Sequence, residues 1–522
     1  MFRSLASSAT ALIVAASPVM ADVTPNEVWE NLSGYYSSMG YAVTTGARDE
    51  AGDTLTLTDV VLTAEVPTAK ASITVPKIVL QQTGDARVRT TIEGNAHFNV
   101  VNEVQDMPST SITLDLAMPE NEILSSGSAA DMTHDFTYPT VTMDLRIIEE
   151  GDDAVEVPAT VTMNDVKMQY HQVTAGQIET TYSATAASMD MSSEVSQPAS
   201  ADGATDAVQM TMNAHVEGIA TSGTVIVPEG GFDAASRLDL ALNNGLNGSG
   251  NVTVGAITGG MTFAGIDAQG APQTGKADYT SGALAVEFSM SKDGLSYGGS
   301  VKGINASLTA DSLPFPVSYA LEDASAQLLF PIAASDAAQP YKLTYSLAGL
   351  TLDDGIWNML DPQKVLSRDP VSLSVDVEGD AMLSHDLLDP DLAEKLSQAT
   401  ANGATEPGEA PAKPATPFIP QTIKINRVAL DAVGASADFS GDLTLPEGAE
   451  QPVGTVQGSL VGVNALLDKL VTVGLLPQDQ LMPVRMMMSM FAKPAEGDPD
   501  NLSTTLEFKE DGSIFANGQQ MK

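Results

Sequence analysis

Three short strings in the sequence resemble catalytic or nucleotide-binding motifs. Residues Gly294–Gly298 have the spacing of a hydrolase nucleophile elbow, and Ser289–Lys292 has the serine–lysine spacing of penicillin-binding enzymes. Residues Gly270–Ala277 approach a phosphate-binding loop, but Ala277 stands where Ser or Thr would hold magnesium. An elbow needs a strand, a sharp turn and a helix, whereas the residues around 294–298 predict a β-hairpin. The sequence therefore predicts no catalytic residues and a non-enzymatic protein.

Metal ligands are sparse and scattered. The chain has no cysteine, which excludes disulfides, thiolate ligands and a thiol nucleophile. No two of its five histidines have the spacing of a zinc motif; they are His97, His134, His171, His215 and His385. Asp353–Asp354 and Glu149–Asp153 could bind calcium weakly through oxygen ligands, although solvated acidic turns are the favoured interpretation. We expect no metal or cofactor.

A methionine-rich segment near the C-terminus holds the candidate site residues. Residues 478–491 predict a helix, on which Met482, Met486 and Met490 lie at positions i, i+4 and i+8 of one face. Methionine is flexible and suits adaptable apolar surfaces. Two interpretations remain open: the stripe packs on the last strands of the fold, or it lines a site for an acyl chain.

The elements that must position these residues are mainly strands. Thr24 to Gly40 is the exception, because Thr24, Pro25 and Glu27 form a capping box and Val28, Trp29, Leu32 and Tyr35 recur at helical spacing. Alternation of polar and apolar residues then predicts half-buried strands, as at residues 54–58, 71–75, 111–116, 140–145, 160–163, 208–212, 223–227, 283–288 and 371–377. Short helices are predicted over 355–361 and 389–398.

The last hundred residues have an order of their own. Strands over 423–432, 435–445 and 455–461 precede helices over 463–471 and 478–491, and strands near 502–508 and 513–516 follow. The prediction is a mainly β fold: a long twisted antiparallel sheet, a few short helices packed on one face, and a C-terminal β-α-α-β unit.

Composition changes suggest boundaries along the chain. We expect a signal peptide at 1–21, a β-rich region with an N-terminal helix at 22–195, and a second β-rich region at 207–400. A linker with five prolines follows at 401–420, and the C-terminal unit occupies 421–522.

The start of the chain predicts export. Arg3 precedes a 12-residue, mostly apolar stretch, Leu5–Ala16, which is too short to cross a bilayer as a helix. Val19 and Ala21 supply the small residues that signal peptidase requires, so cleavage after Ala21 is expected. No later segment is long and apolar enough to span a membrane. These features predict a periplasmic protein.

The net charge is −43, from 67 acidic and 24 basic residues. Such a charge repels nucleic acid, which is excluded as an electrostatic partner. Only 17% of residues are charged and 43% are hydrophobic, a balance typical of a folded chain.

Several segments resemble an uncharacterised exported alphaproteobacterial family, catalogued as a domain of unknown function. The resemblance rests on 464–468, 474–477, Arg485–Met487, Phe491 and 512–519, and residues 356–362 fit it as well. The organisation is more distantly similar to AsmA-like and TamB-like envelope proteins, although a cleavable signal here replaces their membrane anchor. That similarity implies lipid handling on an apolar β groove, and it carries over no catalytic residues.

Together these features predict a periplasmic envelope protein that binds or chaperones a lipid or another apolar ligand in a β groove. The alternative is a structural or interaction scaffold, with an envelope protein as its partner. The two differ in one structural respect: a groove binder leaves one apolar sheet face open, whereas a scaffold fills that face with its own side chains.

Overall fold

The structure is a computed structural model. It describes residues 23–38, 41–66, 69–102, 109–149, 156–197, 208–229, 237–266, 270–402, 416–446, 451–495 and 498–521. The predicted signal peptide lies outside the described residues, as do most of the proposed boundary at 196–206 and of the Pro-rich segment. Export and cleavage after Ala21 therefore stay predictions.

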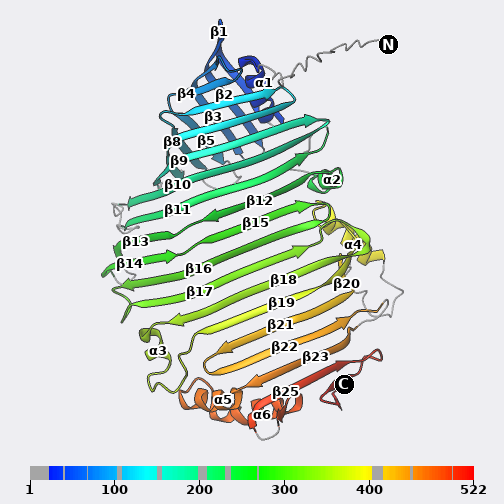
Figure 1. Ribbon diagram of the computed structural model, residues 1–522. Helices are drawn as coiled ribbons and strands as arrows, with labels where there is room; N and C mark the ends of the chain where they lie inside the picture. The colour runs from blue at the N-terminus through cyan, green and yellow to red at the C-terminus, as the bar shows by residue number, and fades with distance from the viewer. Residues whose placement is uncertain are drawn as a thin grey trace, which may run out of the picture.

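The described residues form one antiparallel sheet of 27 strands, which confirms the predicted mainly β class. In Figure 1 the strands follow chain order from the N-terminal end of the sheet to the C-terminal end. The first eleven strands are β1 Ala42–Ala51, β2 Thr54–Val66, β3 Ala69–Gln82, β4 Val88–Glu93, β5 Ala96–Asn102, β6 Thr110–Ala117, β7 Glu122–Ser128, β8 Asp131–Glu149, β9 Glu156–Ala175, β10 Gln177–Gln197 and β11 Val208–Val227.

The remaining strands complete the sheet: β12 Asn247–Val254, β13 Ile257–Ile266, β14 Pro272–Ser281, β15 Leu284–Ser291, β16 Gly294–Ala310, β17 Val317–Phe330, β18 Ser335–Leu352, β19 Val371–Leu383, β20 Phe418–Pro420, β21 Thr422–Ala432, β22 Ala435–Thr444, β23 Val453–Val461, β24 Lys493–Ala495, β25 Asp498–Phe508, β26 Ile514–Ala516 and β27 Gln519–Gln520. The two strands predicted at 208–212 and 223–227 are one continuous strand, β11.

The same pairing scheme occurs twice in the sheet. After β3, two short strands, β4 and β5, each pair with one half of it; β6 and β7 return, and both pair with β8. After β11, strands β12 to β15 repeat this arrangement and β16 closes it. Long strands thus alternate with pairs of half-length strands, and the sheet has two halves side by side.

A line of irregular positions, which we call the seam, marks the boundary between these halves. Asp59, Asp165, Gly218, Gly303 and Gly349 have φ between +50° and +70° and interrupt the ladders of their strands. At the first four positions the register is unchanged on the two sides of the interruption, so both paired strands skip one residue. Near Gly349 the register with β19 also shifts by one residue, as in a β-bulge. The apolar alternation of a strand can change across such a position. In β9, for example, Val161 and Met163 precede Asp165, and Val166 and Met168 follow it.

The helices lie at the ends and borders of the sheet (Figure 1). They are α1 Pro25–Ser38, α2 Leu238–Asn243, α3 Asp354–Leu360, α4 Leu392–Asn402, α5 Val463–Thr472 and α6 Gln478–Phe491. Helix α4 begins three residues later than predicted and continues into the proposed linker, and β20 occupies the linker's other end.

The predicted capping box is present at α1. The Thr24 amide donates to Glu27 Oε2 at 2.8 Å, and the Glu27 amide donates to Thr24 Oγ1 at 3.3 Å. The predicted apolar stripe packs on the sheet: Val28 is buried with Leu55 and Leu57, and Trp29 and Leu32 pack against the same cluster. This is the larger of two buried clusters in the described residues, and it lies at the N-terminal end of the sheet.

Candidate ligand-binding face of the sheet

Cross-strand neighbours align apolar side chains into rows. Residues directly opposite each other on antiparallel strands point to the same face, so the register shows which residues share a surface. One row runs through Leu343 from β15 to β26 without a charged residue. This Leu343 row is Phe288, Tyr297, Leu328, Leu343, Val377, Ile425, Gly441, Val456, Leu506 and Ala516.

Two more rows lie to one side of the Leu343 row on the same face: the row through Tyr345 is its neighbour, and the row through Leu347 lies beyond it. The first is Leu284, Val301, Ala324, Leu347, Leu373, Leu430, Ala437, Leu460 and Leu502. The second is Val286, Gly299, Ala326, Tyr345, Val375, Val428, Phe439, Gly458 and Thr504. We call the three rows together the apolar face. With ~4.8 Å between strands and ~7 Å between alternate residues, it covers on the order of 900 Å².

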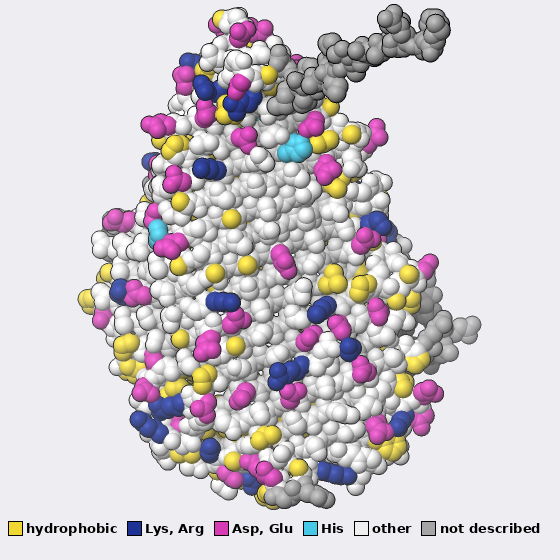
Figure 2. All heavy atoms as spheres, in the orientation of Figure 1, with side chains coloured by type: hydrophobic (Ala, Val, Ile, Leu, Met, Phe, Trp, Pro, Cys, Tyr) yellow, Lys and Arg dark blue, Asp and Glu magenta, His cyan; other side chains and the backbone are white. Residues whose placement is uncertain are grey.

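The opposite face of the same strands is polar. Ser300, Ser325, Ser346 and Ser374 form a serine row across β16 to β19. Farther along, Lys424 pairs with Glu378 and Arg427 with Asp438, at 3.3 and 2.9 Å. Figure 2 shows a face of the molecule where acidic and basic side chains are scattered over the sheet and hydrophobic side chains are not gathered. The two faces of the sheet thus differ sharply in polarity.

The apolar face is open over its central strands. Tyr297 and Leu343 each keep 46% of their surface exposed, and Phe288, Tyr345 and Leu430 are also exposed. Few helices contact these strands: α3 contacts β17, α5 contacts β22 and β25, and α6 contacts β25, whereas α1 lies on β1 to β3. The rows become buried towards β25, where Val456, Leu502 and Thr504 are each under 10% exposed. Contiguous exposed apolar surface of the kind seen on the earlier strands marks binding sites.

Several aromatic rings lie flat across glycines of neighbouring strands. A Cβ on Gly458 would lie 2.4 Å from Phe439 Cδ1, and one on Gly250 would lie 2.8 Å from Tyr182 Oη. Glycine leaves space for the ring at these positions. The rings therefore cover the sheet and leave its surface shallow. Ala306 lies between Tyr279 and Tyr319 in one row, and these residues help to line a hollow of about 340 Å³.

Helix α1 closes the N-terminal end of this side of the sheet. Its Tyr35 ring meets Tyr170 edge to face with centroids 5.6 Å apart, and Asn31 Oδ1 lies 3.2 Å from His134 Nε2. His134 Nδ1 lies 2.7 Å from Ser125 Oγ. Burial lowers the pKa of His134 to about 4 and raises that of Tyr170 to about 12. His134 is thus held neutral in a structural position.

A second structure, which we call the clasp, borders the apolar face at one end of β15 and β16. It consists of α2 and residues 385–398. Ala241, Leu242, Leu246 and Ile332 form its buried centre, and Met290, Leu295 and Leu388 pack against them. Segments far apart in sequence meet in the clasp.

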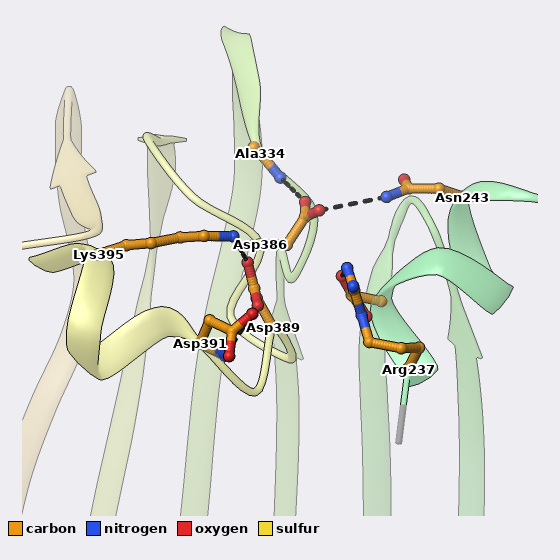
Figure 3. A network of polar contacts seen from close by, with 8 residues as sticks. Arg237, Asn243, Ala334, Asp386, Asp389, Asp391 and Lys395 are labelled. Atoms are coloured by element: carbon orange, nitrogen blue, oxygen red, sulfur yellow. Dashed lines mark hydrogen bonds and ion pairs between the residues drawn. The ribbon is translucent and has the colours of Figure 1, made fainter. Parts of the chain in front are cut away.

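Polar contacts hold the two parts of the clasp together. Asp386 accepts hydrogen bonds from Asn243 Nδ2 on α2 at 3.2 Å and from the Ala334 amide at 2.6 Å (Figure 3). Asp389 pairs with Lys395, and the hydrogen bond from Lys395 lowers the pKa of Asp389. Across the clasp Arg237 donates to Asp239 and lowers its pKa as well. Asp386 and the apolar centre therefore join α2 to the loop that leads into α4.

The predicted hairpin around 294–298 is confirmed, because Ser291 and Gly294 pair at the turn between β15 and β16. Ser289–Lys292 and most of 270–277 lie in or beside strands β15 and β14. Asp353 caps α3 by accepting from the Ile356 amide at 2.9 Å. Residues 150–153 of the other acidic run lie outside the described residues.

The histidines are dispersed over the sheet. His97, His171 and His215 pair with Asp115, Asp131 and Asp190 respectively, and His385 contacts Ser384. Within the described ranges, no three His, Asp or Glu side chains gather as metal ligands.

The methionine stripe faces outward. Met482 and Met486 are each 68% exposed and Met490 is 50% exposed. The helix itself packs on the last strands, since α6 contacts β25 and buries Leu481, but the three methionines lie on its other side. The interpretation as an acyl-chain lining stays a prediction. The rows on the sheet are not predictable from the sequence, because alternation identifies an apolar side of each strand but does not identify the neighbouring strands.

The fold and the open face define the class: a long antiparallel sheet with one polar and one exposed apolar side. The chain belongs to the family described as uncharacterized protein conserved in bacteria (DUF2125), whose model matches residues 256–518, half of the chain. That match covers β13 to β26 and contains the apolar face. No curated protein and no solved structure matches the chain. None of the helices in the described ranges combines the length and hydropathy needed to cross a bilayer.

Proposed function

We propose that this protein is a non-enzymatic, periplasmic envelope protein that binds the acyl chains of a lipid on the apolar face. The observation that carries the proposal is the alignment of three apolar rows across nine strands, on which Phe288, Tyr297, Leu343, Tyr345 and Leu430 are exposed. Exposed apolar surface is stabilised when it is removed from water, by roughly 25 cal/mol per Å². A flexible acyl chain suits a shallow surface of this kind, since it needs no directed polar partner.

Other observations support the same ligand class. Bordering helices and the clasp limit the face at its margins. The export signal predicted at residues 1–21 and the resemblance to AsmA-like and TamB-like envelope proteins agree with lipid handling outside the cytoplasm.

A scaffold that uses sheet edges is the second candidate. Strand β1 pairs on one side with β2, and the described residues supply no strand for its other side. Such an edge can accept a strand from a partner. Arg48, Asp49 and Glu50 place charges along it, a common protection against edge pairing. The open apolar face favours the lipid-binding proposal.

Native mass spectrometry with lipid extraction, on protein purified from the periplasm, tests the proposal. We expect phospholipid or fatty acid bound to the wild type. The double variant Tyr297→Lys/Leu343→Lys places two charges on the apolar face and should retain at least about tenfold less lipid, because each buried lysine costs ~2.5 kcal/mol or more.

The matched control is Ser296→Lys/Thr344→Lys, which changes the adjacent residues on the polar face of the same two strands. It should keep the wild-type amount of lipid. A wild type that is free of lipid, or equal lipid in the two double variants, would overturn the proposal. Cross-linking would then test the scaffold.

A further inference from the structure

Helix α6 is amphipathic with its sides reversed relative to an ordinary surface helix. Such helices normally bury their apolar side and expose the charged one. Here Arg485 is half-buried, whereas Met482, Met486, Met487 and Met490 are each at least 50% exposed. Leu475, in the connection from α5, adds a side chain that is 55% exposed. This apolar stripe needs a covering partner outside the described chain.

Contacts on the inner side hold the helix in this orientation. Arg485 Nη2 donates to Asp468 Oδ2 at 2.8 Å and to the Asn464 carbonyl at 3.1 Å, which ties α6 to α5. The Phe491 carbonyl accepts from Thr504 Oγ1 and from Asn517 Nδ2, at 2.5 and 2.9 Å. Rotating the stripe inward would break these contacts, so its exposure is built into the fold.

The anchoring residue Thr504 also ends a row of the apolar face, next to Gly458 and Phe439. The fixed end of α6 therefore borders the C-terminal end of the apolar face, where Thr504, Leu502 and Val456 are buried. In Figure 1 the α5–α6 pair lies at the C-terminal end of the sheet, opposite the end that α1 closes. An acyl chain that moved along the face would reach α6.

The charge of this region differs from that of the whole molecule. Helix α6 carries one basic group, Arg485, against one acidic group, Asp479, and is neutral, whereas the chain carries −43. A bilayer surface repels an acidic protein least where the local charge is near zero or positive. Methionine side chains adapt to a fluid, irregular surface.

We propose that α6 docks on the surface of a lipid bilayer and places the C-terminal end of the apolar face where acyl chains enter or leave. The docking of α6 on a bilayer does not depend on whether the apolar face binds lipid. The entry or exit of acyl chains at this end does, and therefore rests on the proposed function. Acyl-chain lipids are nearly absent from water because their burial is so favourable, so a carrier must collect them at a membrane.

Flotation with phosphatidylcholine vesicles tests the docking. The wild type should float, and Met482→Gln/Met486→Gln/Met490→Gln should bind at least tenfold more weakly, because glutamine keeps helix propensity but removes the apolar surface. Met359→Gln is the matched control: this methionine is 65% exposed on α3 and its loss should change nothing. Single substitutions at 482 and 486 should give partial losses, which keeps the test valid if the triple variant folds poorly.

Salt dependence supplies a second test. Binding to anionic phosphatidylglycerol vesicles should be weaker than to phosphatidylcholine at low salt and should rise as NaCl screens the net charge of −43. A basic peripheral protein would show the reverse. Wild type that fails to float, a triple variant that floats as well as wild type, or binding to anionic vesicles that falls with salt would each overturn the docking.

A fluorescent fatty acid added without vesicles separates this inference from the proposed function. The α6 triple variant should bind it as wild type does, whereas Tyr297→Lys/Leu343→Lys should not. Probe binding without vesicle binding overturns only the docking. Vesicle binding that needs the methionines, together with no probe binding, upholds the docking and overturns the lipid-binding face.

Discussion

His134 shows how burial at a single residue sets a pH dependence. With the proton on Nε2, the neutral ring donates to Asn31 Oδ1 and accepts from the Ser125 hydroxyl, so both nitrogens have partners. A protonated ring would leave a donor facing Ser125 in a site where it has no exposed surface. Burial lowers the pKa of His134 to about 4, and the nearby Asp135 opposes this only in part.

The sign of the effect follows from proton binding. Between pH 6.5 and about 4 the unfolded chain binds a proton at His134 and the folded chain does not, so the contribution to stability is lost as pH falls. From pH 6.5 to 5 this amounts to up to about 2 kcal/mol. We expect urea unfolding to show that the stability advantage of wild type over His134→Gln shrinks by this amount across the same pH range.

Taking the difference between the two proteins cancels the carboxylates they share. Met359→Gln, an exposed change without a titrating group, should show a difference from wild type that is constant with pH. If the His134→Gln difference is equally constant, the neutral histidine is not a source of the pH dependence.

At the scale of strands, the seam makes specific demands on the backbone. Gly349 has φ +70° and interrupts the pairing of β18 with both of its neighbours. A Cβ there would also lie 2.5 Å from Glu322 Cγ, in an exposed side chain that can move. Gly349→Ala should therefore cost about 1–2 kcal/mol, mainly for the left-handed backbone, measured as a lower urea midpoint.

Gly34 gives the opposite expectation in an ordinary helical position. It lies inside α1, and an added Cβ meets no atom within 4 Å. Gly34→Ala should stabilise the protein by up to about 1 kcal/mol, because alanine has the higher helix propensity. Equal midpoints for the two variants would show that the seam carries no backbone strain.

The seam also explains what sequence could and could not predict about the fold. The capping box at Thr24 and the strands with regular alternation, such as 54–58 and 371–377, follow from local patterns and are present. The sequence predicts strand β11 as two separate strands, because the apolar residues alternate differently on the two sides of Gly218. The two-residue alternation of polar and apolar side chains holds only between seam positions. A long strand therefore gives several short stretches of alternation in the sequence.

The apolar face could not be predicted from the sequence for a related reason. Leu343 and Val377 are neighbours only through the register of β18 and β19, which depends on long-range pairing. The methionine stripe was visible at helical spacing, but its direction depends on Arg485 and Leu481 occupying the inner side. Sequence therefore identified the side chains, and tertiary contacts decided which surface they face.

At the scale of the whole molecule, the charge must be weighed against the open apolar surface. A net charge of −43 keeps copies apart in solution, which offsets the tendency of exposed apolar faces to associate. The same charge repels itself within one molecule and destabilises the folded state. Exposed ion pairs such as Lys424–Glu378 contribute little in return, typically under about 1 kcal/mol each.

Screening should therefore stabilise the protein. Raising NaCl from about 0.02 to 0.5 M shortens the range of charge interactions from ~20 Å to under ~5 Å, which weakens the summed repulsion more than the few short-range ion pairs. We expect the melting temperature, followed by circular dichroism, to rise over this range, and KCl to act equally. A melting temperature that falls with either salt would mean that attractive ion pairs outweigh the repulsion. In that case the net charge would serve solubility, and the attractive ion pairs between strands would already offset its destabilising effect on the folded state.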